Sequence, residues 1–427
     1  MKKLWCSVIA LVLVLSMVFG MTGAVAEEKV KLVFWDECPG TVQTPVFKAL
    51  LDEFMAENPN IEVEYVGIPW DSAKEKYDVA IASNATPDVA SIHNSWLSEY
   101  ALKGAIKPLD EQFNAWEDAA QFSAGVINAA RAAAHDGKLY AIPYTDNLPV
   151  IWVRTDLFAE KGVAIPATWD DFFKAVEAMT DLEKGEYGFA IRGGAGCAGQ
   201  LLHGIVAYSG MKEYFVDGKC QLNNEKAVEY VEKIASLYNV YTAAGDITSG
   251  LGETVSAFDS GVAAMIMHNL GSYGDHKAVI DDDKFQAIPY PAAVTGDLTT
   301  AGSMWCSYVT FENTEHPEEC WKLIQFLASK HGVSAYNEAI GQLPTRADVA
   351  EEPWMATAPH IKTALEYTAQ PGVVSVAEQT HLTTWSGTIS NMIPLFQETL
   401  AGGMTAQEFL DEFAAGLQEG YDEYIAQ

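Results

Sequence analysis

The segment VKLVFWDECPG (residues 30–40) is the first strand-like run of the chain, and it ends in a tryptophan, two carboxylates and a turn. Residues 30–35 are rich in β-forming side chains. The apolar residues that come next recur at helical spacing, at Phe47, Leu50, Leu51, Phe54 and Met55. The segment therefore predicts a buried strand that leads into a helix packed on the same core.

The same pattern repeats along the next part of the chain. Residues 61–68 alternate as a strand, residues 71–83 have the pattern of a helix, and residues 88–92 form another apolar strand. Alternating strands and helices predict an α/β unit with a parallel sheet covered by helices. Ligands of such sheets bind beyond the carboxyl ends of the strands. The segments expected at those ends are residues 35–40, 69–71 and 93–96.

A second series of strand and helix patterns begins after residues 143–149. Its strands and helices are expected at residues 150–153, 169–179, 187–191, 263–267, 285–288, 305–311 and 320–328. The chain of 427 residues is longer than one hydrophobic core usually supports. The sequence thus indicates two α/β units, and periodicity alone does not show whether the later segments return to the first.

The N-terminus has the order of features of a secretory signal peptide, which we expect to comprise residues 1–26. Lys2 and Lys3 precede an apolar run over residues 8–19, and small residues lead to an A-x-A site that ends at Ala26. We expect a secreted product that is periplasmic, extracellular or at the cell surface. An uncleaved membrane anchor is the alternative.

Charge and cysteine content limit the classes of partner. The formal charge of −32 becomes −34 without residues 1–26, and so acidic a surface repels nucleic acid and anionic membranes.

An odd number of cysteines remains after residue 26, so at least one thiol stays free, and a bridge between Cys197 and Cys220 is one option. These cysteines are Cys38, Cys197, Cys220, Cys306 and Cys320.

Catalytic signatures are missing from the sequence. It contains no G-x-S-x-G, H-E-x-x-H or phosphate-loop motif, and its histidines are dispersed, so we expect no catalytic residue, no metal site and no cofactor. Asp36 and Glu37 are not expected to act as an acid pair for glycoside hydrolysis, because neighbouring strand residues point to opposite faces. The glycine-rich residues 192–196 lack a phosphate-binding lysine and predict a flexible loop at a strand end.

Aromatic residues gather at the predicted strand ends. Sugars present C–H faces that stack on aromatic rings, and hydroxyl groups that need Asp, Asn, Gln or Arg partners. The aromatic residues are Trp35, Trp70, Trp96, Tyr144 and Trp305. The first four have polar neighbours in the sequence, namely Asp36, Asp71, Asn94, Asp146 and Asn147. Core packing explains any single tryptophan, but their recurrence at strand ends favours a sugar site.

Several stretches resemble the carbohydrate-binding family of extracellular solute-binding proteins of bacterial ABC importers, which is the maltose-binding-protein-like family. The most specific are DGKLYAIPYTDNLPVIWVRTDLFAEKGVAIPATWDDF (136–172), HPEECWKLIQFLASKHG (316–332) and GQLPTRADV (341–349). Weaker matches are AENPNIEVEYVGI (56–68), TPDVASIHNSWLSEYALKGAIKPLDE (86–111) and FDSGVAAMIMHNLGSY (258–273). These stretches follow the order of the family over nearly the whole chain after residue 26.

This resemblance implies the two-lobed periplasmic-binding-protein fold of type II, in which each lobe is a mostly parallel sheet covered by helices. The implied lobes are residues 27–146 with 295–343, and residues 150–291 with 346–427. Three crossings between them form a hinge, near residues 146–150, 291–296 and 341–346. The resemblance further implies a monomer that closes around a carbohydrate and delivers it to ABC-transporter permease subunits, without chemistry on the ligand.

The resemblance also carries over binding positions. The loop after the first strand matches Trp35 and Asp36, and the loop after the third matches Asn94 to Trp96. A stacking tryptophan of the family falls at Asn269-Leu270-Gly271 here, which leaves the identity of the ligand open. The other expected ligand-binding residues, from the resemblance or from their chemistry, are Trp70, Tyr144, Asp146, Asn147, Arg192, His268, Asn269, Tyr273, Gly302, Ser303, Trp305 and Trp385.

Two alternatives to a sugar-binding protein remain at this point. One is a binding protein for another small solute, either a polyamine, which would suit the acids and aromatic rings, or a glycerol phosphate. A phosphate would need basic residues, and the strand-end loops supply almost none beyond Arg192. The other alternative is a secreted glycoside hydrolase.

Overall fold

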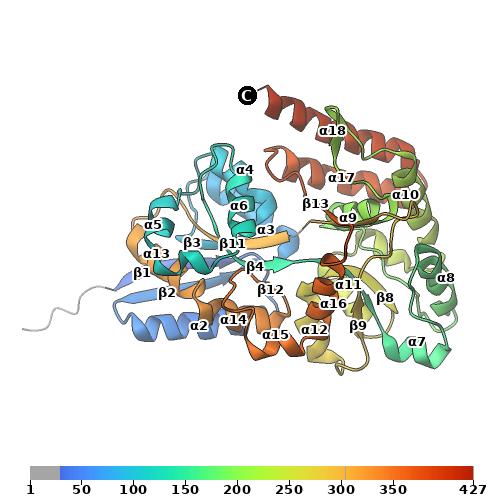
Figure 1. The fold of residues 1–427 in the computed structure, drawn as a ribbon, viewed down its shortest axis with the longest axis horizontal. Helices are drawn as coiled ribbons and strands as arrows, with labels where there is room; N and C mark the ends of the chain where they lie inside the picture. Colours follow the sequence, from blue (N-terminus) through green and yellow to red (C-terminus); the bar gives the residue numbers. More distant parts are fainter. Residues whose placement is uncertain (1–28, 303, 427) are drawn as a thin grey trace, which may run out of the picture.

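The computed structural model describes residues 29–302 and 304–426, which form two α/β lobes side by side (Figure 1). The predicted signal peptide and Ser303 lie outside the described residues. The first lobe combines the N-terminal segments with a later stretch that begins at β11, drawn in orange at the left of Figure 1. The chain therefore returns to its first lobe after it has built most of the second.

A six-stranded sheet with the order β12-β4-β11-β3-β1-β2 lies at the centre of the first lobe. Its strands are β1 (Val30–Asp36), β2 (Ile61–Gly67), β3 (Val89–His93), β4 (Ile142–Asn147), β11 (Met304–Thr310) and β12 (Leu343–Pro344). The helices of this part are α2 (Gln43–Glu57), α3 (Trp70–Ala82), α4 (Asn94–Leu102), α5 (Asp110–Ala115), η1 (Glu117–Gln121), α6 (Ala124–Ala132), α13 (Pro317–Leu327), α14 (Lys330–Ile340) and α15 (Pro353–Thr357).

The directions of these strands agree with the prediction in one half of the sheet only. β1 is parallel to both β2 and β3, as the alternation of strands and helices indicates. β11, however, is antiparallel to β3 and to β4, and β12 is antiparallel to β4. The sheet is thus mixed rather than mostly parallel, because β11 enters it from the second lobe and runs in the opposite direction.

The second lobe is built on the antiparallel sheet β8-β5-β9, which isolated parallel bridges at Tyr187–Ala263 and Ala190–Ile266 extend. Its strands are β5 (Pro149–Val153), β8 (Met265–Asn269), β9 (Gln286–Ile288), the pair β10 (Leu298–Ala301) and β13 (Val373–Val376), and the hairpin β6 (Phe215–Val216) and β7 (Lys219–Cys220). Its helices are α7 (Thr155–Lys161), α8 (Trp169–Met179), α9 (Cys197–Ser209), α10 (Glu225–Leu237), η2 (Ala244–Thr248), α11 (Leu251–Asp259), η3 (Leu270–Ser272), α12 (Tyr273–Val279), α16 (Pro359–Thr368), α17 (Trp385–Leu400) and α18 (Ala406–Ile425).

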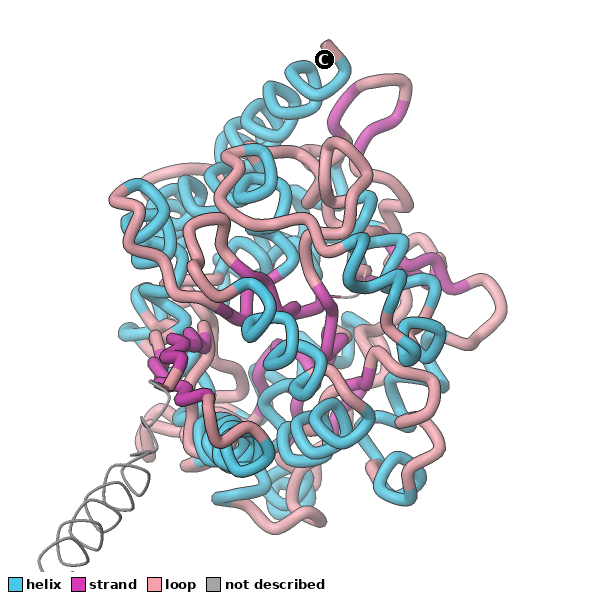
Figure 2. The backbone as a smooth tube through the Cα atoms, turned by 90° about the vertical axis from the view of Figure 1, so that its left-hand side faces the viewer, coloured by secondary structure: helices cyan, strands magenta, loops and turns pink. Residues whose placement is uncertain are grey.

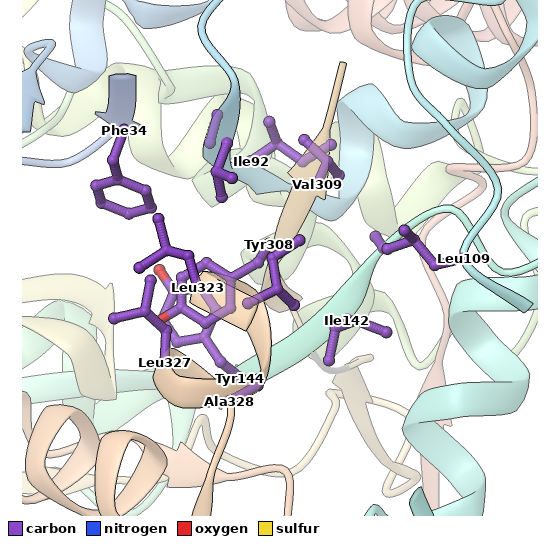
Figure 3. Packing of buried hydrophobic residues seen from close by; sticks show 14 of the residues in the cluster. Phe34, Ile92, Leu109, Ile142, Tyr144, Tyr308, Val309, Leu323, Leu327 and Ala328 are labelled. Atoms are coloured by element: carbon purple, nitrogen blue, oxygen red, sulfur yellow. The ribbon is translucent and has the colours of Figure 1, made fainter. Parts of the chain in front are cut away.

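Each lobe has its own hydrophobic core, and helices surround the strands on the outside (Figure 2). In the first lobe, Phe34 of β1 packs near Tyr308, Leu323 and Leu327 (Figure 3). The side chains of Leu32 and Phe34 are buried because alternate residues of β1 face the same side of the sheet. A third, smaller cluster around Trp152 joins the lobes, since it includes Leu343 as well as residues of the second lobe. Among the described residues, no helix has the length and apolar composition needed to cross a lipid bilayer.

The chain crosses between the lobes at three places, two of which differ from the predicted residues. The first is at Leu148, between β4 and β5, inside the expected range. The second lies between β10 and β11, later than residues 291–296, because β10 pairs with β13 and packs on α9 of the second lobe. The third follows Val349, later than residues 341–346, because Val349 is part of the first core.

Arg346 holds the last segment of the first lobe in place. Its guanidinium group donates to Asp118 and Asp348 at 3.0 and 2.8 Å and to the carbonyl oxygen of Ala328 at 3.1 Å. The Arg346 side chain is only 1% exposed, so these contacts compensate for its burial. The predicted division that begins the second lobe at residue 346 therefore separates Arg346 from its partners.

The five cysteines of the described chain are free thiols. Cys197 opens α9, whereas Cys220 belongs to the β6–β7 hairpin beside α18, where its amide donates to Gln418. The bridge between Cys197 and Cys220 that the sequence left open is therefore not formed.

Candidate ligand-binding site between the lobes

The carboxyl ends of β1, β2 and β3 face the second lobe. Nη2 of Arg192 lies 3.5 Å from Oδ1 of Asp71, at the start of α3. The Thr41 hydroxyl donates to Asp275 of α12 at 3.2 Å. The Ser98 hydroxyl of α4 donates to the carbonyl oxygen of His381, ahead of α17, at 3.0 Å. These three contacts place the predicted binding edge at the junction between the lobes.

Two tryptophan rings stack at this edge. Trp70 is the first residue of α3 and Trp96 lies in the first turn of α4, so both follow directly after parallel strands. Their ring centroids are 5.7 Å apart and their planes meet at 20°. Trp96 is buried, whereas Trp70 is half-buried. Trp35 packs edge-to-face with Tyr77, with ring centroids 5.3 Å apart, and Tyr77 in turn contacts Trp96.

Asp36 and Glu37 are buried together where β1 ends. Asp36 accepts hydrogen bonds from the Tyr65 hydroxyl at 2.7 Å and from the Cys38 amide at 3.0 Å. Glu37 is 1% exposed, and its Oε2 has no hydrogen-bond partner among the described residues. Neither carboxylate has a lysine or arginine within ion-pair distance in the described part of the chain. The sequence predicts that Glu37 and Asp36 point to opposite faces of the sheet. In the structure both side chains are buried at the same strand end, because Glu37 lies just beyond β1.

Burial changes the acidity of both groups. Loss of hydration raises the pKa of Asp36 to about 6, although the hydrogen bonds from Tyr65 and Cys38 oppose the change. Loss of hydration, with the charge of Asp36, raises the pKa of Glu37 to about 7, although Ser91 and Cys306 donate to Glu37 and oppose it. Both carboxyl groups therefore keep a proton to a higher pH than exposed carboxyl groups do.

Replacement of Glu37 by glutamine is expected to alter the pH dependence of stability. The folded protein holds the Glu37 proton more tightly than the unfolded chain does, so this group stabilises the fold fully below its ordinary pKa of 4.5. That contribution is lost as the pH rises through about 7. Chemical denaturation of the ligand-free proteins should show the stability of the wild type falling relative to Glu37→Gln over this range. A stability difference that does not change with pH would contradict the buried, proton-exchanging Glu37.

Three amide side chains that lie in or follow predicted binding segments have polar atoms without partners among the described residues. Oδ1 of Asn94, at the start of α4, and Oδ1 of Asn147, at the end of β4, are buried and unpaired. Nε2 of Gln200, in the first turn of α9, is the third. Buried polar atoms normally have hydrogen-bond partners, so these atoms are available to the hydroxyl groups of a ligand.

The glycine-rich residues 192–196 form a fixed loop rather than the flexible loop that the sequence predicts. The amides of Gly193 and Gly194 donate to the carbonyl oxygens of Asp246 and Ser249, each at 2.9 Å. A Cβ atom on Gly194 would lie 2.5 Å from the carbonyl oxygen of Thr248, which explains why the loop requires glycine. The loop holds Arg192, whose Nε donates to the carbonyl oxygen of Ala195 at 2.5 Å.

A Gly193→Ala substitution is expected to displace Arg192. The added Cβ would lie 2.5 Å from the carbonyl oxygen of Ile247 and 2.6 Å from that of Asp246, so the backbone must move. Overpacking of this kind costs about 1–3 kcal/mol, and we expect a lower melting temperature and ligand affinity reduced about tenfold. Gly199→Ala in α9 is the control, because its Cβ meets no atom within 4 Å. Equal ligand affinity in the two variants would contradict this role of the loop.

Four of the predicted aromatic residues are packed in the hydrophobic clusters of the protein. Tyr144 stacks on Tyr308 at 4.1 Å, and its hydroxyl pairs with that of Ser91. Trp385 is 2% exposed and lies in the second core. Trp305, in the first core, and Tyr273, in the cluster around Trp152, are also buried. These rings contribute to packing, whereas the sequence predicts that they contact a ligand. The difference arises because a sequence does not show which side of an element faces a ligand.

The remaining predicted residues have mainly local contacts. The Nδ1 atom of His268 pairs with the Ser272 hydroxyl at 2.9 Å, and Asn269 caps η3 by accepting from the Gly271 amide. Oδ1 of Asp146 accepts from the amide of Asn147 at 2.8 Å. A Cβ atom on Gly302 would lie 2.9 Å from Cα of Ala377, so glycine permits a close approach there.

A histidine and glutamate pair near the junction was not predicted. Nε2 of His203, on α9, lies 3.4 Å from Oε1 of Glu378, which follows β13, and both side chains are buried. His93 faces Trp70 from the first lobe with its ring centroid 5.3 Å away. Loss of hydration lowers the pKa of His93, and the charge of Glu378 opposes this change. Only the position of His93 at a strand end could have indicated this group.

Comparison with known proteins identifies the family of the chain. A family of bacterial extracellular solute-binding proteins matches residues 49–363. A binding protein of Brucella abortus (strain 2308) is 26% identical over 72% of this chain and 74% of its own length. The multiple sugar-binding protein of Streptococcus mutans is 23% identical over 74% and 75% of the two chains.

A solved structure has the same fold. It is an ABC-transporter solute-binding protein of Thermotoga lettingae bound with α-D-tagatose, and it superimposes with a TM-score of 0.80 at 20% identity, covering 92% of this chain and 100% of that one. The predicted two-lobed α/β fold is thus confirmed. This protein belongs to the family of bacterial extracellular solute-binding proteins.

Proposed function

We propose that the protein captures a carbohydrate between its two lobes and delivers it to the permease subunits of an ABC importer. The observation that carries this proposal is the Trp70–Trp96 stack at the carboxyl ends of the parallel strands, where Glu37 after β1 and Asn94 after β3 also have polar atoms without partners among the described residues. Relatives that are named for sugars, such as the multiple sugar-binding protein of Streptococcus mutans, support the ligand class.

The two kinds of side chain serve different parts of a sugar. A half-buried Trp70 offers an apolar surface to a pyranose C–H face, while Trp96 behind it fixes the orientation of the ring. Asn94, Asn147 and Gln200 offer one unpaired polar atom each to hydroxyl groups. Because these residues come from both lobes, a sugar that contacts all of them favours the closed arrangement over an open one.

The arrangement fits binding without chemistry. Asp36 and Glu37 are adjacent in sequence and lie at one strand end, whereas glycoside hydrolysis needs two carboxyl groups that flank the scissile bond. We therefore propose a non-enzymatic role as a monomer outside the cytoplasm. Movement of the lobes about the three crossings would expose and enclose the ligand.

A ligand screen with two readouts tests the proposed function. Melting temperatures are measured across mono- and oligosaccharides, with polyamines and glycerol phosphates as competing classes, because a ligand that binds only the folded protein raises its apparent stability. Hits are confirmed by calorimetry, and the recovered ligand is analysed for cleavage. We expect at least one sugar to bind and to be recovered intact. Binding of a polyamine or glycerol phosphate with no response to any sugar would overturn the proposal, as would cleavage of the sugar.

A further inference from the structure

The charge balance at the end of β1 goes beyond what a neutral sugar requires. Asp36 and Glu37 are each 1% exposed, and the described residues place no lysine or arginine within ion-pair distance of either. Both hydrogen bonds to Asp36 come from uncharged donors, the Tyr65 hydroxyl and the Cys38 amide. Two acidic groups are therefore buried side by side without a basic partner in the described part of the chain.

The charged groups around Asp36 and Glu37 do not supply a free positive charge among the described residues. Cys38 feels the charges of Asp36, Glu37 and Asp275, which are acidic, and of Arg192, which is basic. The Arg192 guanidinium already contacts Asp71 and the carbonyl oxygen of Ala195. Among the described residues, the pKa values of Cys306, Tyr77, Tyr144, Tyr308 and Tyr336 are raised by burial and also by the charge of Glu37, and none of these groups carries a positive charge. The local field is thus negative, as is the field of the whole chain.

Glu37 has one carboxylate oxygen without a partner among the described residues. Ser91, in the middle of β3, and Cys306, near the start of β11, both donate to its carboxylate. Its other oxygen, Oε2, has no partner among the described residues although the side chain is fully buried. An unpaired carboxylate in a buried site is unfavourable, and a ligand cation with N–H donors would satisfy its charge and its hydrogen bonding together.

We infer that the bound carbohydrate is an amino sugar whose ammonium group lies against Glu37 and Asp36. An ammonium group has three N–H donors, and the free Oε2 of Glu37 accepts one of them. The sugar ring then extends toward Trp70 and the amides on the strand ends. This inference rests on the proposed function, since it assigns the class of sugar that the same site takes.

Paired sugars test the inference. Calorimetry at pH 7 compares glucosamine, galactosamine and mannosamine, and oligomers of glucosamine, with the neutral sugars that carry a hydroxyl in place of the amine. In at least one pair the amino sugar should bind ten or more times more tightly than its neutral partner. The two carboxyl groups should release protons on binding, beyond those that the partly neutral sugar amine takes up, because their pKa values of about 6 and about 7 fall when a cation approaches. Calorimetry in buffers of different ionisation enthalpy measures the net number.

Variants separate this inference from a general loss of binding. Glu37→Gln and Asp36→Asn should each reduce the ratio of the amino-sugar affinity to the neutral-sugar affinity and the number of protons released. Glu64→Gln, an exposed glutamate on the neighbouring strand β2, should leave both unchanged. Melting temperatures establish that every variant is folded.

The outcomes distinguish the inference from the proposed function. If neutral sugars bind as tightly as their amino partners in every pair, the inference fails and the proposed function stands. If no sugar of either kind binds while spermidine does, both fail. If an amino sugar is preferred but Glu37→Gln keeps the full preference, the assignment of the ammonium group to Glu37 is wrong.

Discussion

Replacement of Trp70 by alanine is expected to weaken sugar binding about 10- to 100-fold while the fold persists. Trp70 is half-buried at the start of α3, and its ring stacks on Trp96 at 5.7 Å. Loss of the aromatic surface removes about 1.5–3 kcal/mol of apolar burial from the complex, which corresponds to that range of affinity. Calorimetry with the sugar that the ligand screen identifies measures the change.

Trp321→Ala is the matched control for this loss. Trp321 is also half-buried, but it lies on α13 in an open hollow of about 440 Å³, formed within the first lobe with Glu111, Gln112 and Trp116. Its removal should leave the affinity for the sugar unchanged. Equal affinities in Trp70→Ala and the wild type, with both folded, would place the sugar elsewhere.

Replacement of Trp152 by alanine is expected to cost about 3–5 kcal/mol of unfolding free energy, the usual range for removal of a buried tryptophan. Trp152 is 0% exposed in the centre of β5. Its ring contacts His276 at 5.1 Å and Phe285 at 5.7 Å, and its Nε1 donates to the carbonyl oxygen of Asn269 at 3.0 Å. Chemical denaturation without ligand measures the loss.

Trp152→Phe separates the two contributions to that loss. Phenylalanine keeps most of the apolar surface, but it leaves the carbonyl oxygen of Asn269 with only the longer hydrogen bond from the Ser272 hydroxyl at 3.4 Å, and loss of the shorter bond costs about 0.5–1.5 kcal/mol. We therefore expect a smaller loss than in Trp152→Ala. A loss below about 1 kcal/mol in Trp152→Ala would show that the cluster joining the lobes tolerates a cavity, against the usual cost.

Local periodicity predicts the first half of the fold well. The alternation of apolar residues from β1 to β3 depends on contacts between neighbouring segments, and the parallel pairing of these strands follows from it. The place of β11 between β3 and β4 does not follow, because its partners are distant in sequence. The same holds for the pairing of β10 with β13, which moves the second crossing.

The candidate site residues stay a prediction. Position at a strand end is the signal that selects Trp70, Trp96, Asn94 and Arg192, and in the structure Trp70 stacks on Trp96 while Arg192 contacts Asp71 of the other lobe. It gave no information about the direction in which a ring points, so Tyr144 and Trp385 were included although they pack in the cores. The prediction discounted Glu37 because neighbouring strand residues point to opposite faces. That rule does not apply to Glu37, since β1 ends at Asp36.

The position of β11 affects how the newly made chain can fold. Ribosomes release the N-terminal segments first, but the sheet of the first lobe lacks a middle strand until residues 304–310 have emerged. Until then β3 and β4 each present an open edge, and pairing across so long a connection is slow. The first sheet is therefore completed only after most of the second lobe has been made, so the first lobe stays incompletely folded until late in synthesis.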